Sequence, residues 1–282
     1  MQSYQGVALV CPVSLGYVKQ SHHSAAWFIG SVLREMLNLS GLEKRAVDGL
    51  ALSSFSLEPD SAIALTQHFN LEPRWIEQIN LGGVSGLVAL RRAARAVQAG
   101  DAEIVACIGG DTAHHRSFEH VAANFSAWSV DAVFPYGAGG PNMPFSLITE
   151  HYMRAYGAQR EDFARICLDQ RYNANHYDAA ILGHKSLSLG EYLAARPISG
   201  PLHLFDCVMP CAGGEGFLMM SEDRARSLDL PYATILAADE LHNAHPEDPV
   251  QTRGGWTKYI EAMYEMAALG PRDIDCLQTY DD

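Results

Sequence analysis

The sequence predicts a layered α/β fold in which a mixed sheet is sandwiched between helices. Three observations support this class. Strand-like and helix-like segments alternate along residues 1–111, and the alternation resumes after residue 197. A short pattern, Leu-x-x-Arg-x-Val/Ile-Asp-x-Leu, occurs at residues 42–50 and again at 269–277. Such helix-to-strand links are common, but the matching order of elements around both copies indicates a duplicated αβ unit.

The first part of the chain supplies most of the expected sheet. Apolar residues at helical spacing predict a helix at 25–39, which Ser40 and Gly41 end. We expect two shorter helices, one at 61–69 and one at 87–98 that stops before Gly100. The intervening apolar runs predict strands at residues 6–11, 47–53 and 103–108, and residues 75–80 lead into the motif that begins at Asn80.

The composition changes over residues 112–197, which we interpret as a loop domain inserted between 1–111 and 198–282. Helices are expected inside it at 145–156 and 160–175, and a glycine-rich loop at 137–141. Beyond it we expect strands at 213–220, 232–238 and 274–279, and a helix at 256–269. The second copy of the repeat has no following helix and strand before Asp282, so we expect a truncated duplicated fold that lacks about a third of its length.

Charge and composition limit the kinds of binding partner and the cellular location that we expect. The formal net charge is −13 and no stripe of Lys or Arg offsets it, which disfavours nucleic acid. No apolar run approaches the roughly 20 residues of a membrane span. The beginning of the chain lacks the pattern of a signal peptide. Six scattered cysteines favour reduced thiols, and we expect a cytoplasmic protein.

One motif bears most directly on chemistry. Residues 80–87 read Asn-Leu-Gly-Gly-Val-Ser-Gly-Leu and open an apolar helical run. This stretch resembles the nucleophile elbow of the thiolase superfamily, in which a reactive cysteine stands between an upstream Asn and a downstream Ser-Gly. Gly83 occupies the place of that cysteine, and glycine cannot act as a nucleophile.

Further motifs extend the resemblance over nearly the whole chain. Gly109-Gly110-Asp111 resembles the Gly-Gly turn after the family's central strand, and residues 150–174 resemble the helix pair of its loop domain. Residues 196–207 are similar to the segment that returns to the core. The resemblance implies a thiolase-like αβα fold with a duplicated core and an inserted loop domain.

The sequence also departs from the family pattern after the loop domain. Residues 211–216, Cys-Ala-Gly-Gly-Glu-Gly, stand where the family usually has Ser/Asp-Gly-Ala-Ala, so a glutamate enters the returning strand. Tyr280-Asp281 replaces a short Asn-Glu or His-Asp motif, which resembles the lipid-transfer branch near the sterol-carrier thiolases. Some members of that branch are retro-aldolases that cleave β-hydroxyacyl-CoA esters beside a small zinc-ribbon/OB-fold partner.

The resemblance places site residues at both motifs. The backbone N–H groups of Gly83, Val84 and Ser85 would hold the thioester oxygen, although a tight turn that needs glycine explains the same motif. Tyr280 would move a proton with Asp281 orienting it, although a buried core tyrosine is an equal alternative. We expect no cofactor beyond the coenzyme A of the substrate.

Other clusters of reactive residues carry weaker signals. Three histidines, His114, His115 and His120, lie close together in sequence but lack the spacing of a metal site. Cys207 and Cys211, four residues apart, would be about 13 Å apart in a strand, too far for one zinc ion.

Three functions remain compatible with the sequence. The first is an enzyme that cleaves an acyl-CoA at its Cα–Cβ bond by a retro-aldol reaction. The alternatives are an acyltransferase that uses a cysteine beyond residue 282 and a non-catalytic thiolase-like scaffold subunit. A homodimer is expected to pair through an edge strand at residues 103–108, with or without a small zinc-ribbon/OB-fold partner protein.

Overall fold

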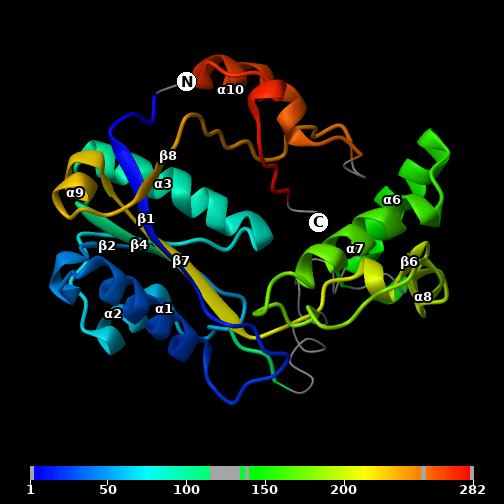
Figure 1. The fold of residues 1–282 in the computed structure, drawn as a ribbon, viewed down its shortest axis with the longest axis horizontal. Helices are drawn as coiled ribbons and strands as arrows, with labels where there is room; N and C mark the ends of the chain where they lie inside the picture. Colours follow the sequence, from blue (N-terminus) through cyan, green and yellow to red (C-terminus); the bar gives the residue numbers. More distant parts are fainter. Residues whose placement is uncertain (1–2, 115–133, 137–139, 249–251, 280–282) are drawn as a thin grey trace.

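The computed structural model describes residues 3–114, 134–136, 140–248 and 252–279. A six-stranded mixed sheet forms its centre, in the strand order β3-β2-β4-β7-β1-β8 (Figure 1). The strands are β1 (Val7–Ser14), β2 (Gly49–Ser53), β3 (Trp75–Gln78), β4 (Ile104–Asp111), β7 (Gly213–Ser221) and β8 (Tyr232–Thr234). The predicted class of fold, a mixed sheet covered by helices, is confirmed.

Helices cover both faces of this sheet. Helices α1 and α2 pack on one face and α3 on the other, as Figure 1 shows. The α-helices are α1 (Ala25–Ser40), α2 (Ala62–Phe69), α3 (Ser85–Ala99), α6 (Asn142–Tyr156), α7 (Arg160–Ala174), α8 (Leu189–Leu193), α9 (Glu222–Ser227) and α10 (Ile260–Ala267). Among the described helices, none is long and apolar enough to cross a membrane.

Local sequence signals explain the longest helix of the core. At the start of α1, the Ser24 side chain accepts a hydrogen bond from the Trp27 N–H, and Gly41 ends the helix at a φ of 66°. Its buried face carries apolar residues at helical spacing, which include Phe28, Val32 and Met36. The spacing in the sequence predicted this helix to within one residue.

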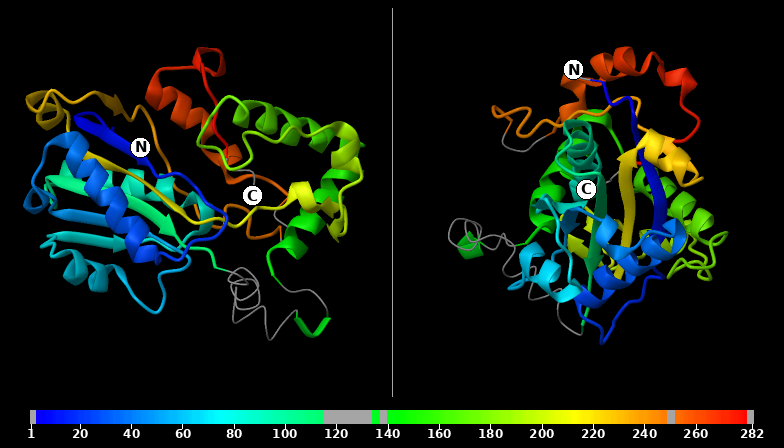
Figure 2. Two further views of the ribbon diagram at one scale, coloured as in Figure 1. Left: turned by 60° about the horizontal axis from the view of Figure 1, so that its bottom comes forward. Right: turned by 90° about the vertical axis from the view of Figure 1, so that its left-hand side faces the viewer.

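The described part of residues 112–197 contributes no strand to the six-stranded sheet. It contains α6, α7 and α8, which lie to one side of the sheet in Figure 1 and in the left view of Figure 2. A separate two-stranded sheet pairs β5 (Pro197–Ser199) with β6 (Leu202–His203). The domain boundaries themselves stay a prediction.

The short 3-10 helices complete the described elements. They are η1 (Lys44–Ala46), η2 (Gly82–Val84), η3 (Phe134–Tyr136), η4 (Leu204–Asp206), η5 (Gly255–Lys258) and η6 (Pro271–Asp273). The helix expected at 256–269 is divided between η5 and α10. The strand expected at 232–238 is shorter, because only Tyr232–Thr234 pairs with β1.

The expected edge position of residues 103–108 is wrong. Strand β4 lies between β2 and β7, and the edges of the sheet are β3 and β8. The apolar character of β4 therefore reflects burial on both faces, where Ile104, Val105 and Ala106 are at most 2% exposed. An interface through β4 is excluded by its two neighbours, while the homodimer stays a prediction.

Two further expectations are wrong in detail. The Gly109-Gly110 pair is not a turn, because both residues continue β4 and pair with Glu215 and Gly214 of β7. Residues 274–279 form no strand. Leu277 is 77% exposed there, and no described strand lies beside the segment to supply the backbone hydrogen bonds that a strand needs.

Candidate functional site

The elbow between β3 and α3 has the predicted strand-to-helix geometry. The chain leaves the edge strand β3, passes through η2 and enters α3 at Ser85. Gly82 has a φ of 67°, in the left-handed region that favours glycine. Gly83 lies inside the 3-10 turn, a conformation that any L-residue adopts. The conformational need for glycine therefore falls on Gly82 and does not explain Gly83.

The polar groups of Ser85 are used within the elbow. Its N–H donates to the Gly82 carbonyl, and its hydroxyl donates to the same oxygen at 2.7 Å. The hydroxyl also accepts from the Leu81 N–H at 3.1 Å. Gly83 and Val84 are exposed, whereas Ser85 is buried. The exposed donors of the predicted set are thus Gly83 and Val84, and thioester binding by the set stays a prediction.

The elbow lies above the end of the central sheet. The Cys107 sulfur is 3.9 Å from the Ala89 carbonyl oxygen, which places Ala89 of α3 over Cys107 of β4. Strands β3 and β4 both run parallel to β2, so the connecting helix α3 runs antiparallel to them. Ser85 lies about 6 Å from Ala89, one helical turn back along α3. Gly109 lies about 6.6 Å from Cys107, two residues onward along β4.

Gly109 leaves open space beneath the elbow. A Cβ atom placed there would meet no atom within 4 Å. Its neighbours in the register are Ser53 of β2 and Glu215 of β7. The alternation along β7 puts Glu215 on the face of Phe217 and Met219, which pack with α3. A carboxylate therefore borders the open space on the elbow side of the sheet.

Two hydroxyl groups hold the Glu215 carboxylate. The Ser14 hydroxyl donates to its Oε1 at 3.0 Å, and the Tyr17 hydroxyl also donates to it. Burial, followed by the hydrogen bond to Glu215, raises the pKa of Tyr17, so this phenol stays protonated and acts as a donor. The Tyr17 ring packs against Gly213, where a Cβ atom would lie 2.4 Å from the ring.

A second carboxylate at this end of the sheet is engaged through one of its oxygens. Asp111 Oδ1 accepts the hydroxyls of Ser54 at 2.9 Å and Ser56 at 2.7 Å. It also accepts the N–H groups of Phe55 and Ser56, each at 2.8 Å. Asp111 thereby fixes the loop after β2 to the end of β4, a structural role.

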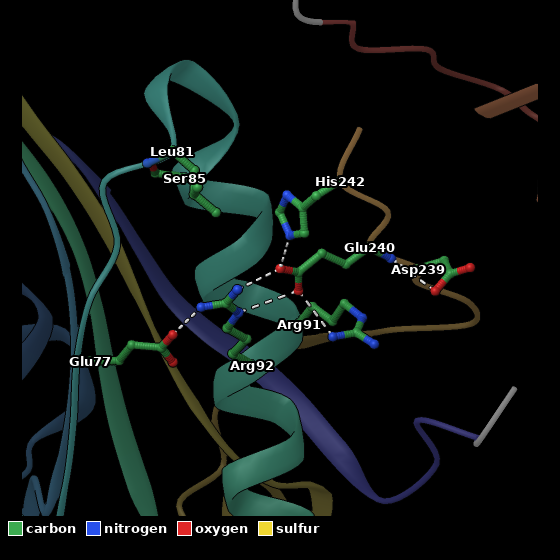
Figure 3. A network of polar contacts seen from close by, with 8 residues as sticks. All are labelled: Glu77, Leu81, Ser85, Arg91, Arg92, Asp239, Glu240 and His242. Carbon is green, nitrogen blue, oxygen red and sulfur yellow. Dashed lines mark hydrogen bonds and ion pairs between the residues drawn. The ribbon is translucent and has the colours of Figure 1, made fainter. Parts of the chain in front are cut away.

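A network of charges holds α3 on its outer side (Figure 3). Glu240 accepts from Arg91 at 3.0 Å, from Arg92 at 2.6 Å and from His242 at 2.7 Å. Arg92 also pairs with Glu77 of β3. The hydrogen bond from Arg92 is the largest cause that lowers the pKa of Glu240, to about 2. The network joins the edge strand, α3 and the segment after β8.

Three cysteines, Cys107, Cys207 and Cys211, do not have the properties of a replacement nucleophile. Burial raises the pKa of Cys207 and Cys211, and the charge of Asp111 raises the pKa of Cys211 further. Complete burial raises the pKa of Cys107 as well. A raised pKa suppresses the reactive thiolate.

The structure describes some of the remaining candidate site residues but not others. Tyr280 and Asp281 lie outside the described residues, as do His115 and His120. His114 Nδ1 lies 2.7 Å from the Ser21 carbonyl oxygen. Within the described ranges, no three His, Cys, Asp or Glu side chains form a group that could hold a metal ion.

Sequence reasoning missed two parts of this region. Glu215 stood out as a departure from the family pattern but received no role, although a glutamate in an apolar strand beside the elbow was the available signal. The Arg91, Arg92 and Glu240 network joins residues about 150 positions apart, and no local pattern announces that pairing.

Comparison with known proteins finds two similar proteins that are named as an aldolase and a lyase. No family model matches the sequence. A steroid side-chain-cleaving aldolase of Thermomonospora curvata is 26% identical over 261 residues, which are 86% of this chain and 65% of that protein. A 17-hydroxy-3-oxo-4-pregnene-20-carboxyl-CoA lyase of Mycobacterium tuberculosis is 26% identical over 238 residues, or 79% and 59% of the two chains. The chain thus spans less than two thirds of the length of either relative.

Solved structures agree on the fold. An Ltp2-ChsH2(DUF35) aldolase superposes with a TM-score of 0.80 and 26% identity, over 95% of this chain and 71% of that chain. Human mitochondrial 3-ketoacyl-CoA thiolase gives a TM-score of 0.69 at 15% identity, covering 97% and 79%. A monomeric SCP2-thiolase-like protein of Mycobacterium smegmatis gives 0.65 at 15%, covering 100% and 61%. The resemblance to the thiolase fold is confirmed, and an SCP2-thiolase-like protein is among the structures that share it.

Proposed function

We propose that this chain, which has the thiolase-superfamily fold, is the thiolase-like part of an enzyme that cleaves a β-hydroxyacyl-CoA by a retro-aldol reaction. The observation that carries the proposal is Gly83. The chain keeps the strand-to-helix elbow, but glycine stands in place of the nucleophilic cysteine. The backbone conformation of Gly83 does not require glycine, so the missing side chain is a chemical feature of the site. The similarity to an aldolase and a CoA lyase supports the same reaction.

A retro-aldol reaction needs no covalent nucleophile, so it is compatible with an elbow that lacks the cysteine. Removal of the β-hydroxyl proton lets the Cα–Cβ bond break, which yields a carbonyl compound and the enolate of a shorter acyl-CoA. Backbone N–H groups of Gly83, Val84 and Ser85 would stabilise the thioester oxygen as charge develops on it. Tyr280 would act as a general acid–base group in this reaction, and Asp281 would orient Tyr280. Coenzyme A enters as part of the substrate, and the scheme uses no other cofactor.

We extend the proposal to the assembly and its location. The similarity to an Ltp2-ChsH2(DUF35) complex supports a partner protein, for which we propose a small zinc-ribbon/OB-fold protein. A homodimer would use a surface other than β4, because both neighbours of β4 are strands of its own sheet. We propose the cytoplasm as the location.

Product analysis separates the three possible functions. The full-length protein would be incubated with a β-hydroxyacyl-CoA, for example the 17-hydroxylated pregnene ester that the relative's name specifies. Release of a ketone or an aldehyde with a shorter acyl-CoA supports the lyase. CoA-dependent acyl transfer through a trapped acyl-cysteine would establish an acyltransferase. Absence of both, with and without the partner, would establish a scaffold subunit.

The proton step can be tested at Tyr280. Tyr280→Phe removes the hydroxyl and keeps the ring, so we expect kcat to fall by about 10²–10⁴-fold, the usual contribution of a general acid or base. Substrate binding should change little. Tyr232→Phe, at the edge strand β8, serves as the matched control. An unaffected kcat in Tyr280→Phe would remove Tyr280 from the mechanism.

A further inference from the structure

We propose that Glu215 is the base that takes the proton from the β-hydroxyl of the substrate. The inference rests on the proposed retro-aldol function and deepens it by naming a second catalytic residue. A retro-aldol reaction needs one group to remove the hydroxyl proton and another to protonate Cα. Glu215 would fill the first role, and Tyr280 would fill the second as the donor to the enolate.

The position of Glu215 is the first argument. Its register neighbour Gly109 lies beneath the first turn of α3, one helical turn from the Ala89–Cys107 contact. Directly opposed residues on one sheet face have Cβ positions about 5 Å apart. Glu215 therefore borders the open space above Gly109, where a substrate carbon held by the elbow would lie.

The way Glu215 is held is the second argument. Its described hydrogen-bond partners are the hydroxyls of Ser14 and Tyr17, and no described ion pair includes it. Two hydroxyl donors orient the carboxylate and still leave lone pairs for another proton. The side chain is exposed, so a substrate hydroxyl can reach it.

The neighbouring carboxylate is a poorer candidate for the same role. Asp111 Oδ1 already accepts four hydrogen bonds from the loop of Ser54, Phe55 and Ser56. This oxygen therefore holds the loop after β2 against the end of β4. Among the described carboxylates at this end of the sheet, Glu215 combines the elbow face with an accessible oxygen.

The proton and electron balance closes without another reactant. Glu215 takes the hydroxyl proton, the oxygen lone pair forms the carbonyl, and the Cα–Cβ bonding pair moves to the thioester enolate. Tyr280 gives its proton to Cα as the enolate collapses. The proton on Glu215 then returns to Tyr280. No oxidation occurs, and no atom is gained or lost.

Substitution of the carboxyl group tests the assignment. Glu215→Gln in the full-length enzyme should lower kcat by about 10²–10⁴-fold with little change in KM. Glu215→Ala should be equally slow, and added formate should restore part of the rate in proportion to its concentration. Formate rescue supports a catalytic carboxylate, because a purely structural side chain would not be replaced by a small ion in solution.

The controls separate this inference from the proposed function. Glu222→Gln, at the first residue of α9 directly after the far end of β7, should keep the wild-type rate, and circular dichroism should show all variants folded. Wild-type cleavage with full activity in Glu215→Gln overturns the role of Glu215 alone. A slow Glu215→Ala without formate rescue also overturns it. A wild-type enzyme that cleaves no β-hydroxyacyl-CoA overturns the proposed function as well.

Discussion

Gly109 and Gly110 are neighbours in β4 that face opposite sides of the sheet, and their surroundings differ completely. A Cβ atom at Gly110 would lie 2.8 Å from the Ile29 side chain and 3.3 Å from its backbone nitrogen in α1. A Cβ atom at Gly109 would have no neighbour within 4 Å. One glycine therefore permits close packing of a helix, whereas the other keeps space open beneath the elbow.

The difference continues across the sheet. Gly214 and Gly216 of β7 also face α1, where added Cβ atoms would lie 2.9 Å and 2.8 Å from Val32. The α1 face is thus closely interlocked. On the α3 face, small residues such as Ala89 and Ala93 contact the sheet, and the charges around Glu240 tie α3 to its surroundings. The α1 face of the sheet is therefore closely packed against a helix, whereas the α3 face borders the candidate site.

The largest effect on stability is expected on the interlocked face. Gly110→Val would push α1 away from β4, because part of the obstruction is the Ile29 backbone. We expect a loss of about 3 kcal/mol in the free energy of unfolding, the upper range for overpacked cores. Urea denaturation of the purified protein measures it. A loss below about 1 kcal/mol would show that this face is less tightly packed than the structure indicates.

A smaller effect is expected from the charge network on the other face. Glu240→Gln removes the carboxylate that Arg91 and Arg92 share and leaves Arg92 paired with Glu77 alone, so we expect a loss of about 2 kcal/mol at neutral pH. Because folding lowers the pKa of Glu240 from 4.5 to about 2, its stabilisation is present above pH 4.5 and is lost as the pH falls toward 2. The gap between wild type and variant should therefore narrow in acid.

Urea denaturation at a series of pH values measures this gap. Glu43→Gln, an exposed residue paired only with Arg45 among the described ion pairs, is the control and should show no comparable gap. A gap that stays constant down to pH 3 would contradict the assigned pKa.

The smallest change in stability is expected at Gly109. Gly109→Ala adds one methyl group to open space in a strand, so the free energy of unfolding should change by less than about 1 kcal/mol. The same methyl group would narrow the space beside Glu215, so KM for a β-hydroxyacyl-CoA should rise. Steady-state kinetics beside urea denaturation separates the two effects. Strong destabilisation would contradict the contrast between the faces.

The sequence predicted what depends on local order. The helix ends at Gly41 and Gly100 and the elbow at 80–87 are local patterns, and the structure has them. Strand order is not local. The apolar run at 103–108 is equally compatible with an edge or a centre, and only pairing with β2 and β7 decides between them.

The site shows the same limit. The replacement of the nucleophile by Gly83 could be inferred from the sequence because the elbow motif is continuous. Ser14, Glu215 and Gly109 are brought together only by the register of three strands, and their relation cannot be derived from spacing along the chain. The 274–279 segment had a strand-like sequence, but a strand also requires a neighbouring strand, which sequence pattern does not supply.

The hydrogen bonds around Asp111 have a mechanical consequence. The chain leaves the core immediately after Asp111, and Thr112 donates through its N–H to Ser56 and through its hydroxyl to the His23 carbonyl. The returning chain is also anchored, because Ala212 and Val18 exchange backbone hydrogen bonds. Hydrogen bonds thus hold both ends of the inserted segment to the core. A movement of that segment would therefore be transmitted directly to the end of the sheet that carries Gly109 and Glu215.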